Sequence, residues 1–217
     1  MALNAIYYPK VKFDSLYIPG ILHQIYDEKV YAPIFDGMKD GVAIDCGANC
    51  GLVTGYMRQF CKKVYAIEPS PEHFEALSEN KKFNEWNNVE IFNLALSDKV
   101  GESKFLQSDT NRTANSLIEW IPGGFFTSEV TVKTTDIETF FKKNKIGDVD
   151  FLKMDIEAAE RFVLKSDAFA RVINQIKTML VEFHQPGWEE LVELVHSFGF
   201  HSEKQNVDTI TFIFRRG

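Results

Sequence analysis

Short apolar runs alternate with amphipathic stretches along most of the chain. The apolar runs that predict strands are bounded by glycine, proline or polar clusters, and they cover residues 42–46, 63–69, 89–96, 149–155 and 176–184. Between them, apolar residues recur with the spacing of one helix face. Strands that alternate with helices predict an α/β fold with a mainly parallel sheet and helices on both of its faces.

The stretches between the strands predict the helices, at residues 52–60, 70–84, 137–144, 158–167 and 188–198. The helix at 70–84 has the clearest start, because Ser70 is a suitable N-cap and Pro71 occupies the first helical position. The remaining patterns predict strands at 101–106, 129–136 and 208–216 and a short helix within 27–35.

Length and composition are those of a globular protein. The chain has 217 residues, of which 45% are hydrophobic and 25% charged, which suffices for one domain with a proper core. No run approaches the roughly 20 apolar residues of a membrane span, and the first residues lack the layout of a signal peptide. We expect a cytoplasmic protein with one domain over 1–217, in which an N-terminal extension or lid (1–40) precedes the core (41–217).

The charge balance argues against one class of partner, and the cysteines argue against disulfides and a zinc site. A net charge of −7 counts against a broad nucleic-acid surface, so no nucleic-acid partner is expected. Cys46, Cys50 and Cys61 are an odd set close together, which favours small core residues in a reducing compartment. Cys46 and Cys50 also lack a second ligand pair at the spacing of a zinc finger.

The stretch "AIDCGANCGLVTGYMRQF" (43–60) predicts a strand, a glycine loop and a helix. Its glycines, Gly47 and Gly51, do not have the G-x-G-x-x-G spacing of a dinucleotide site, and the Gly-Lys-Ser/Thr ending of a P-loop is absent. Instead, Asp45 precedes the loop and Glu68 ends the next strand. Ligands of such sheets bind beyond the carboxyl ends of the strands, where both acids would lie.

These two acids indicate the ligand. Asp45 would repel a pyrophosphate but could attract an ammonium group, and Glu68 could accept hydrogen bonds from both hydroxyls of a ribose. S-adenosylmethionine has an amine-bearing tail and a free ribose but no phosphate, so it is the expected cofactor. The alternative is that Gly47 and Gly51 merely close a tight turn, with Asp45 capping the helix.

Five blocks agree in order and spacing with a known family: "VAIDCGANCG", "VYAIEPSPEHFEAL", "NLALSDKVGE", "TTDIETFF" and "VDFLKMDIEAAERFVLK". Over about 42–184 the chain resembles the FkbM-type family of S-adenosylmethionine-dependent methyltransferases. The resemblance implies the class I methyltransferase (Rossmann-like) fold, a three-layer sandwich around a seven-stranded, mainly parallel sheet with an antiparallel last strand. It also implies O-methylation of a hydroxyl on a sugar, glycolipid or secondary metabolite.

The resemblance also carries residue roles. It implies that four segments contact the cofactor: the glycine loop and the ends of the second, third and fourth strands. The residues are Asp45, Gly47, Ala48, Asn49, Gly51, Glu68, Pro69, Ala95, Leu96, Ser97 and Asp155. The sequence departs from the family's usual D-x-E-G-x-E block at Ala158, where the family has glycine. If that glycine serves a positive φ or a close approach of substrate, Ala158 changes the pocket.

Methyl transfer also needs a group that removes the proton of the acceptor. His184 follows a predicted strand end, and the ordinary pKa of histidine suits a base near neutral pH; the alternative is a hydrogen-bonded structural residue. Asp155, Glu157 and His184 are the expected catalytic residues, and Glu157 and Glu182 are candidate substrate or metal groups. Asp155, Glu157, Glu182 and His184 together could bind a divalent cation through hard oxygen ligands, but their spacing is not a ligand signature, so no metal is predicted. Glu160 is expected on a solvated helix face.

The segment 108–126 is long for a connection, which favours a lid or binding loop. Trp120, Phe125 and Phe126 could stack on a small-molecule or glycosidic acceptor, with a plain disordered loop as the alternative. Other functions stay open: a module that binds the donor without turnover, a nucleic-acid or protein methyltransferase, and, least favoured by the glycine spacing, a dehydrogenase. The oligomeric state is also open, with a homodimer as one option.

Overall fold

The computed structural model describes residues 18–108, 115–117, 126–205 and 209–217. Its large sheet is built from β1 (Gly41–Cys46), β2 (Cys61–Ile67), β3 (Val89–Phe92), β7 (Val149–Met154), β8 (Ile176–Glu182), β9 (Phe200–Lys204) and β10 (Thr211–Arg216). The spatial order of these strands is β3-β2-β1-β7-β8-β10-β9. The crossover between β1 and β7 therefore lies at the centre of the sheet.

The direction of each strand matches the expected fold. β1 pairs in parallel with β2 and β7, and parallel pairing continues to β3 on one side and β8 on the other. β10, the last strand of the chain, runs antiparallel to both of its neighbours, β8 and β9. The mainly parallel, seven-stranded sheet with an antiparallel last strand is thus confirmed. The pattern analysis missed β9, because its sequence "FHSEK" is too polar to stand out.

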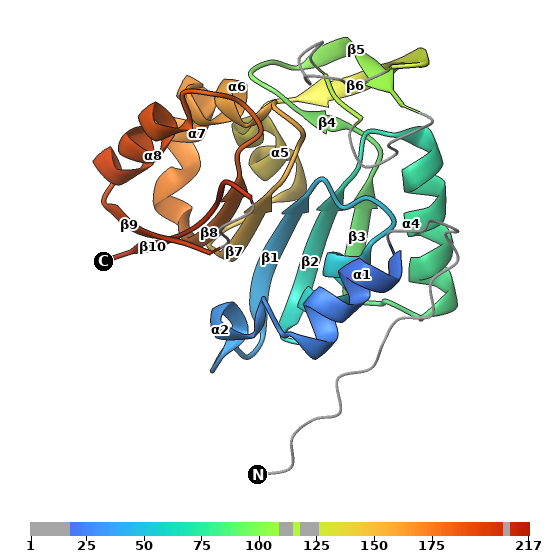
Figure 1. Ribbon diagram of the computed structural model, residues 1–217, viewed down its shortest axis with the longest axis horizontal. Helices are drawn as coiled ribbons and strands as arrows, with labels where there is room; N and C mark the ends of the chain where they lie inside the picture. The colour runs from blue at the N-terminus through green and yellow to red at the C-terminus, as the bar shows by residue number, and fades with distance from the viewer. Residues whose placement is uncertain (1–17, 109–114, 118–125, 206–208) are drawn as a thin grey trace.

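Helices cover both faces of this sheet (Figure 1). One layer comprises α1 (Ile18–Leu22), η1 (His23–Asp27), α2 (Ala32–Phe35), α3 (Leu52–Met57) and α4 (Pro71–Phe83). The other comprises α5 (Ile137–Asn144), α6 (Glu160–Leu164), α7 (Asp167–Val172), the short η2 (Ile173–Gln175) and α8 (Trp188–Ser197). None of the helices in the described part of the chain is long and apolar enough to span a membrane.

Neighbouring residues of the central strands face opposite layers. Ala43 and Phe151 pack with the layer of α2, α3 and α4, whereas Ile44 and Leu152 pack with the layer of α5 to α8. Alternation of this kind follows from the period of a strand. It explains why these strands are near-continuous apolar runs in the sequence, since both faces are buried.

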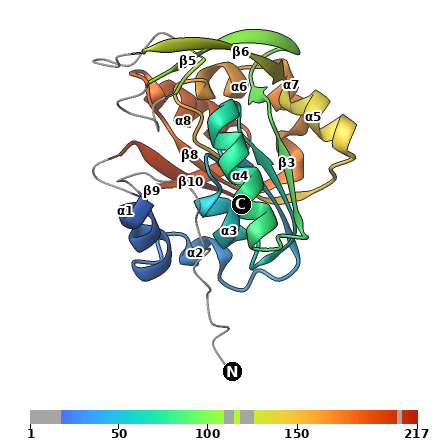
Figure 2. The same ribbon diagram turned by 90° about the vertical axis from the view of Figure 1, so that its right-hand side faces the viewer.

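A second, small sheet differs from the sequence expectation. The predicted strand at 89–96 is two strands: β3 ends at Phe92, and β4 (Ala95–Leu96) pairs instead with β6 (Ser128–Thr135), which pairs with β5 (Gly101–Gln107). The break falls at Asn93, whose side-chain amide donates hydrogen bonds to the carbonyl oxygens of Glu68 and Pro69. This small sheet lies beyond the upper end of β1, β2 and β3 (Figures 1 and 2).

Two helix predictions also need correction. The predicted helix at 158–167 is only α6, and α7 was not predicted. Ser166 Oγ accepts the backbone N–H of Phe169 and starts α7 at Asp167, the last residue of the predicted helix. The segment 27–35 holds only the end of η1 and the short α2. Polar caps within an apolar pattern are hard to detect, since the periodicity continues across them.

Gly51 should be needed for folding, since it begins α3 at a φ of +91° and a Cβ there would lie 2.6 Å from Leu77 Cδ1. We expect Gly51→Ala to lower the free energy of unfolding by about 1–3 kcal/mol, because both strain and overlap oppose it. Gly147→Ala is the matched control, since nothing lies within 4 Å of its added Cβ. Urea unfolding of both variants tests this, and equal stabilities would contradict it.

Candidate active site

A cavity of about 590 Å³ opens at the carboxyl ends of the central strands. The loop after β1, the ends of β2, β7 and β8, and the strand β4 all contribute to its wall. Of the residues expected to contact a cofactor, those that line it are Gly47, Ala48, Asn49, Glu68, Pro69, Ala95, Leu96 and Asp155. The expected catalytic residues, His184, Asp155 and Glu157, line the same cavity.

The glycine loop is folded back onto the end of β2. The N–H groups of Gly47 and Ala48 both donate to the carbonyl oxygen of Ile67, at 3.0 Å each. Gly47 has a φ of +80°, and a Cβ there would overlap the carbonyl oxygen of Asp155. Only glycine fits this position, because the loop crosses directly over the end of β7.

Glu68 anchors the loop from the other side. Its Oε2 accepts the N–H of Asn49 and its Oε1 accepts the N–H of Ser70, both at 2.8 Å. The side chain is buried, and burial raises the pKa of this carboxyl to about 7 although both backbone hydrogen bonds lower it. Each carboxylate oxygen keeps a further lone pair on the cavity side of the loop.

Three of the residues expected at the cofactor are not among those that line the cavity in the described chain. Asp45 is fully buried and accepts a hydrogen bond of 2.6 Å from Thr54 Oγ1. Gly51 packs against α4, and Ser97 Oγ donates to the carboxylate of Asp98. Their expected contact with the cofactor stays a prediction.

Lys153 is the residue that sequence reasoning missed. Its ammonium Nζ lies 3.1 Å from Asp155 Oδ2, 3.5 Å from Asp45 Oδ1 and 3.2 Å from the carbonyl oxygen of Gly47. Burial alone would lower the pKa of this lysine, but the two carboxylates outweigh burial and raise it, so the ammonium stays charged. The signal was a single lysine within the apolar strand "VDFLKM".

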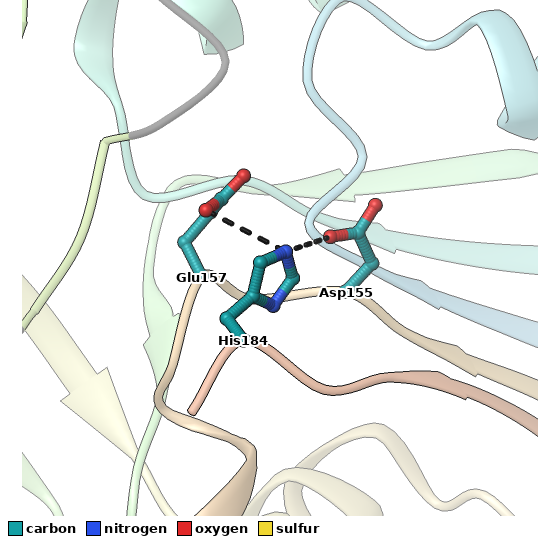
Figure 3. Close-up of side chains that lie close together, drawn as sticks. All are labelled: Asp155, Glu157 and His184. Carbon is teal, nitrogen blue, oxygen red and sulfur yellow. Dashed lines mark ion pairs between the residues drawn. The ribbon is translucent and has the colours of Figure 1, made fainter. Parts of the chain in front are cut away.

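His184 joins two carboxylates in one cluster (Figure 3). Its Nε2 lies 3.6 Å from Glu157 Oε2 and 3.7 Å from Asp155 Oδ1. A third carboxylate oxygen, Oε1 of Glu182, lies 3.8 Å from the same nitrogen. The ends of β7 and β8 therefore bring together the residues that the sequence expected to be catalytic, from segments almost 30 positions apart in the chain, as adjacent parallel strands do.

Glu160 was expected on a solvated helix face, and this prediction was wrong. Its side chain is buried and accepts the N–H of Ile156 at 2.9 Å and the Nδ1–H of His184 at 3.1 Å. The reason is the tight turn before α6, in which Glu157 and Ala158 both have positive φ. The turn directs the first residue of α6 back toward the strand ends.

The same turn explains the departure at Ala158. This residue has a φ of +77° and is fully buried, so the position does require the conformation that glycine adopts freely. An alanine there carries roughly 1–2 kcal/mol of strain. The backbone nevertheless keeps Glu157 in the cavity wall and Glu160 beneath His184.

The carboxylates change the titration of His184. Burial lowers the pKa of its imidazole, but the hydrogen bond to Glu160 and the charges of Glu160, Glu157 and Asp155 raise it to about 10. The ligand-free protein therefore holds an imidazolium at neutral pH. The ordinary histidine pKa, on which the sequence argument for a base rested, does not apply in this environment.

The expected lid segment is only partly described. Trp120 and Phe125 lie outside the described residues, whereas Asn115 and Leu117, from the same segment, line the cavity. On the opposite side, Gly20, Ile21, Gln24 and Tyr31 of the N-terminal segment complete the wall.

Removing the charge of Lys153 should destabilise the fold strongly. We expect Lys153→Met to lower the free energy of unfolding by about 3–5 kcal/mol, because Asp45 would remain buried without its counter-charge. The measurement is chemical denaturation near neutral pH. The double variant Lys153→Met/Asp45→Asn should recover part of the loss, since it removes the unpaired charge as well; a loss that the second substitution deepens would contradict this explanation.

Comparisons with known proteins agree with this geometry. An uncharacterized RNA methyltransferase of Oceanobacillus iheyensis is 37% identical over 76 residues, which are 35% of this chain and 16% of that protein. The FkbM methyltransferase structure from Methylobacillus flagellatus superposes with a TM-score of 0.52 at 15% identity, covering 81% of this chain and 43% of that one. This chain thus spans less than half the length of either.

A putative methyltransferase from Streptococcus mutans, solved in complex with SAH, superposes with a TM-score of 0.51 at 11% identity over 88% of this chain and 97% of that one. At these identities the structural similarity shows the fold alone. The sequence itself matches the methyltransferase FkbM domain over residues 45–207, a range that begins at the acid before the glycine loop. The chain therefore belongs to the FkbM methyltransferase family.

Proposed function

We propose that the protein transfers the methyl group of S-adenosylmethionine to a hydroxyl of a small-molecule or glycosidic acceptor. One observation carries the proposal: a single cavity has the glycine loop and Glu68 on one part of its wall and the cluster of His184, Asp155 and Glu157 on another. The first part suits the donor, and the second suits an acceptor whose proton must be removed. Membership of a methyltransferase family supports the reaction type.

The residues present fit the donor. The buried carboxylate of Glu68 supplies acceptors for the ribose hydroxyls, and its bonds to the N–H groups of Asn49 and Ser70 hold it in place. Ala95 and Leu96 offer apolar surface for the adenine. Asp155 would attract the ammonium or sulfonium charge at the methionine end. The donor supplies an electrophilic methyl group when it is bound.

The chemistry asked of the protein is then small. An acceptor hydroxyl bound at the cluster gives its proton to a carboxylate group there. Its oxygen forms a bond to the methyl carbon, the carbon–sulfur bond breaks, and the electron pair of that bond stays on sulfur. The protein has to align the oxygen with the methyl group and exclude water. The N-terminal wall residues Gln24 and Tyr31 contribute to that exclusion.

RNA is the second candidate acceptor, because the curated relative from Oceanobacillus iheyensis is named as an RNA methyltransferase. The match covers only 76 residues, however, and the acidic balance opposes contacts to phosphates. Carboxylates also crowd the part of the cavity proposed for the acceptor. The acidic net charge and the carboxylates in the cavity both favour a neutral, hydroxylated acceptor.

The cofactor part of this proposal can be tested by calorimetric titration with S-adenosylhomocysteine. We expect Glu68→Gln to weaken binding by about tenfold or more, because an amide offers fewer acceptors to the ribose. Glu75→Gln, on the exposed side of α4, is the control that should bind as wild type does. Wild-type affinity in Glu68→Gln would remove the ribose assignment.

The pH dependence gives a separate test. The raised pKa of Glu68, about 7, means that its carboxylate form is lost as pH falls through neutrality. Affinity for S-adenosylhomocysteine should therefore decline between pH 8 and about 5.5, by at most tenfold per unit. Glu68→Gln should remove most of this slope. A flat wild-type profile would mean that the ionised form is not what binds the cofactor.

The reaction itself is tested by incubating the protein with labelled donor and two panels, one of hydroxylated small molecules and glycosides and one of RNA transcripts. We expect label transfer to the first panel and a loss of about 100-fold or more in kcat for Asp155→Asn. Transfer to RNA alone would replace the acceptor class. Donor binding with no transfer to either panel would favour a module without turnover.

A further inference from the structure

We propose that Nε2 of His184 and the carboxylates of Asp155 and Glu157 form a site for one hard divalent cation of the Mg²⁺ or Mn²⁺ type. The proposal deepens the proposed function and rests on it for the role of the cation, which would hold the acceptor oxygen. The binding itself depends only on these side chains. Their spacing along the sequence is no ligand signature. The pairing of β7 with β8 brings the three residues together.

Geometry carries the first step. One ligand atom from each of the three residues lies within 4.8 Å of the other two. The imidazole Nε2 is 3.6 Å from the oxygen of Glu157 and 3.7 Å from that of Asp155. Ligands about 2.1 Å from an octahedral ion lie about 3–4 Å apart. Side-chain rotations that move the ligand atoms by roughly a few tenths of an ångström would therefore bring them to coordination distance. Figure 3 shows the ring nitrogen directed between the two carboxylates.

The orientation of His184 carries the second step. Its other nitrogen, Nδ1, is held by the buried carboxylate of Glu160, which the N–H of Ile156 fixes in turn. Metal-binding histidines in general donate the second ring N–H to such a carboxylate, which sets the tautomer and turns the ring. Glu160 thus lies outside the ligand set but aims Nε2 into the cavity.

Charge carries the third step. Among the described residues, His184 is the only ion-pair partner within reach of Glu157 and of Glu182, whose oxygen lies 3.8 Å from Nε2. Asp155 shares Lys153 with the buried Asp45. The cavity wall here therefore holds more carboxyl groups than basic groups. A divalent ion would balance this excess where a monovalent imidazolium does so only in part.

The donor set selects the kind of ion. Carboxylates suit Mg²⁺, Mn²⁺ and Ca²⁺, and one imidazole among them favours a transition metal such as Mn²⁺. Cys46, Cys50 and Cys61 are buried and do not belong to this cluster of ligand atoms. The ligands lie on one wall of the cavity, so the remaining coordination positions face the acceptor side. There the ion would lower the pKa of a coordinated hydroxyl.

The test is a titration of the full chain with Mn²⁺, followed by the electron paramagnetic resonance signal of free Mn²⁺ and by calorimetry. We expect one ion to bind the wild type, and Glu157→Gln to weaken binding by tenfold or more. Glu160→Gln should weaken it by about tenfold as well, because it releases the ring of His184. Glu203→Gln, an exposed carboxylate on β9, is the matched control and should bind as wild type does.

Absence of binding up to millimolar Mn²⁺, or equal binding by Glu157→Gln and Glu203→Gln, would overturn the site. Circular dichroism of each variant establishes that it is folded, and Glu160→Gln supplies a second test if Glu157→Gln is not. A parallel titration with S-adenosylhomocysteine separates the two proposals. Cofactor binding without Mn²⁺ binding refutes the cation alone, and Mn²⁺ binding without cofactor binding upholds the cation but refutes the proposed function.

Discussion

The buried ammonium of Lys153 is the interaction on which the site depends. It lies between the carboxylates of Asp45 and Asp155, at the ends of the two central strands, and also meets the carbonyl oxygen of Gly47. An isolated charge in that place would be costly, and so would either carboxylate. The ammonium and the two carboxylates are tolerated there because they offset one another. Their contacts fix the glycine loop relative to the end of β7.

The electrostatics of the cavity follow from this arrangement. Lys153 pairs with Asp45 and Asp155, and in the described part of the chain the ion-pair partner of Glu157 and Glu182 on the same wall is His184. The imidazole is therefore held charged in the ligand-free protein, while burial raises the pKa of Glu157 to about 8. This arrangement supports the proposed cation site, and the acidic net charge of the chain supports the proposed acceptor class.

The central part of the fold could be predicted because β1, β2, β7 and β8 are largely buried and therefore mostly apolar. β9 and the start of α7 at Ser166 could not be predicted. β9 is a polar strand, and α7 begins because of one local hydrogen bond from Phe169 N–H to Ser166 Oγ. At the site, Glu68 and His184 were identified because each follows a strand. Lys153 and Glu160 were not, because their roles depend on partners distant in sequence, and Glu160 also on the positive φ angles before it.

The pairing of β1 with β7 has a consequence for folding. Val42 donates its N–H to Asp150 across 108 positions of sequence, and every residue pair between these strands is similarly remote. Pairings between such remote segments are intrinsically slow to form. A nascent or truncated chain with the glycine loop but without β7 would lack Lys153 and leave Asp45 uncompensated. The glycine loop and the end of β7 therefore become one site when these two strands pair, and ligand binding would report that pairing.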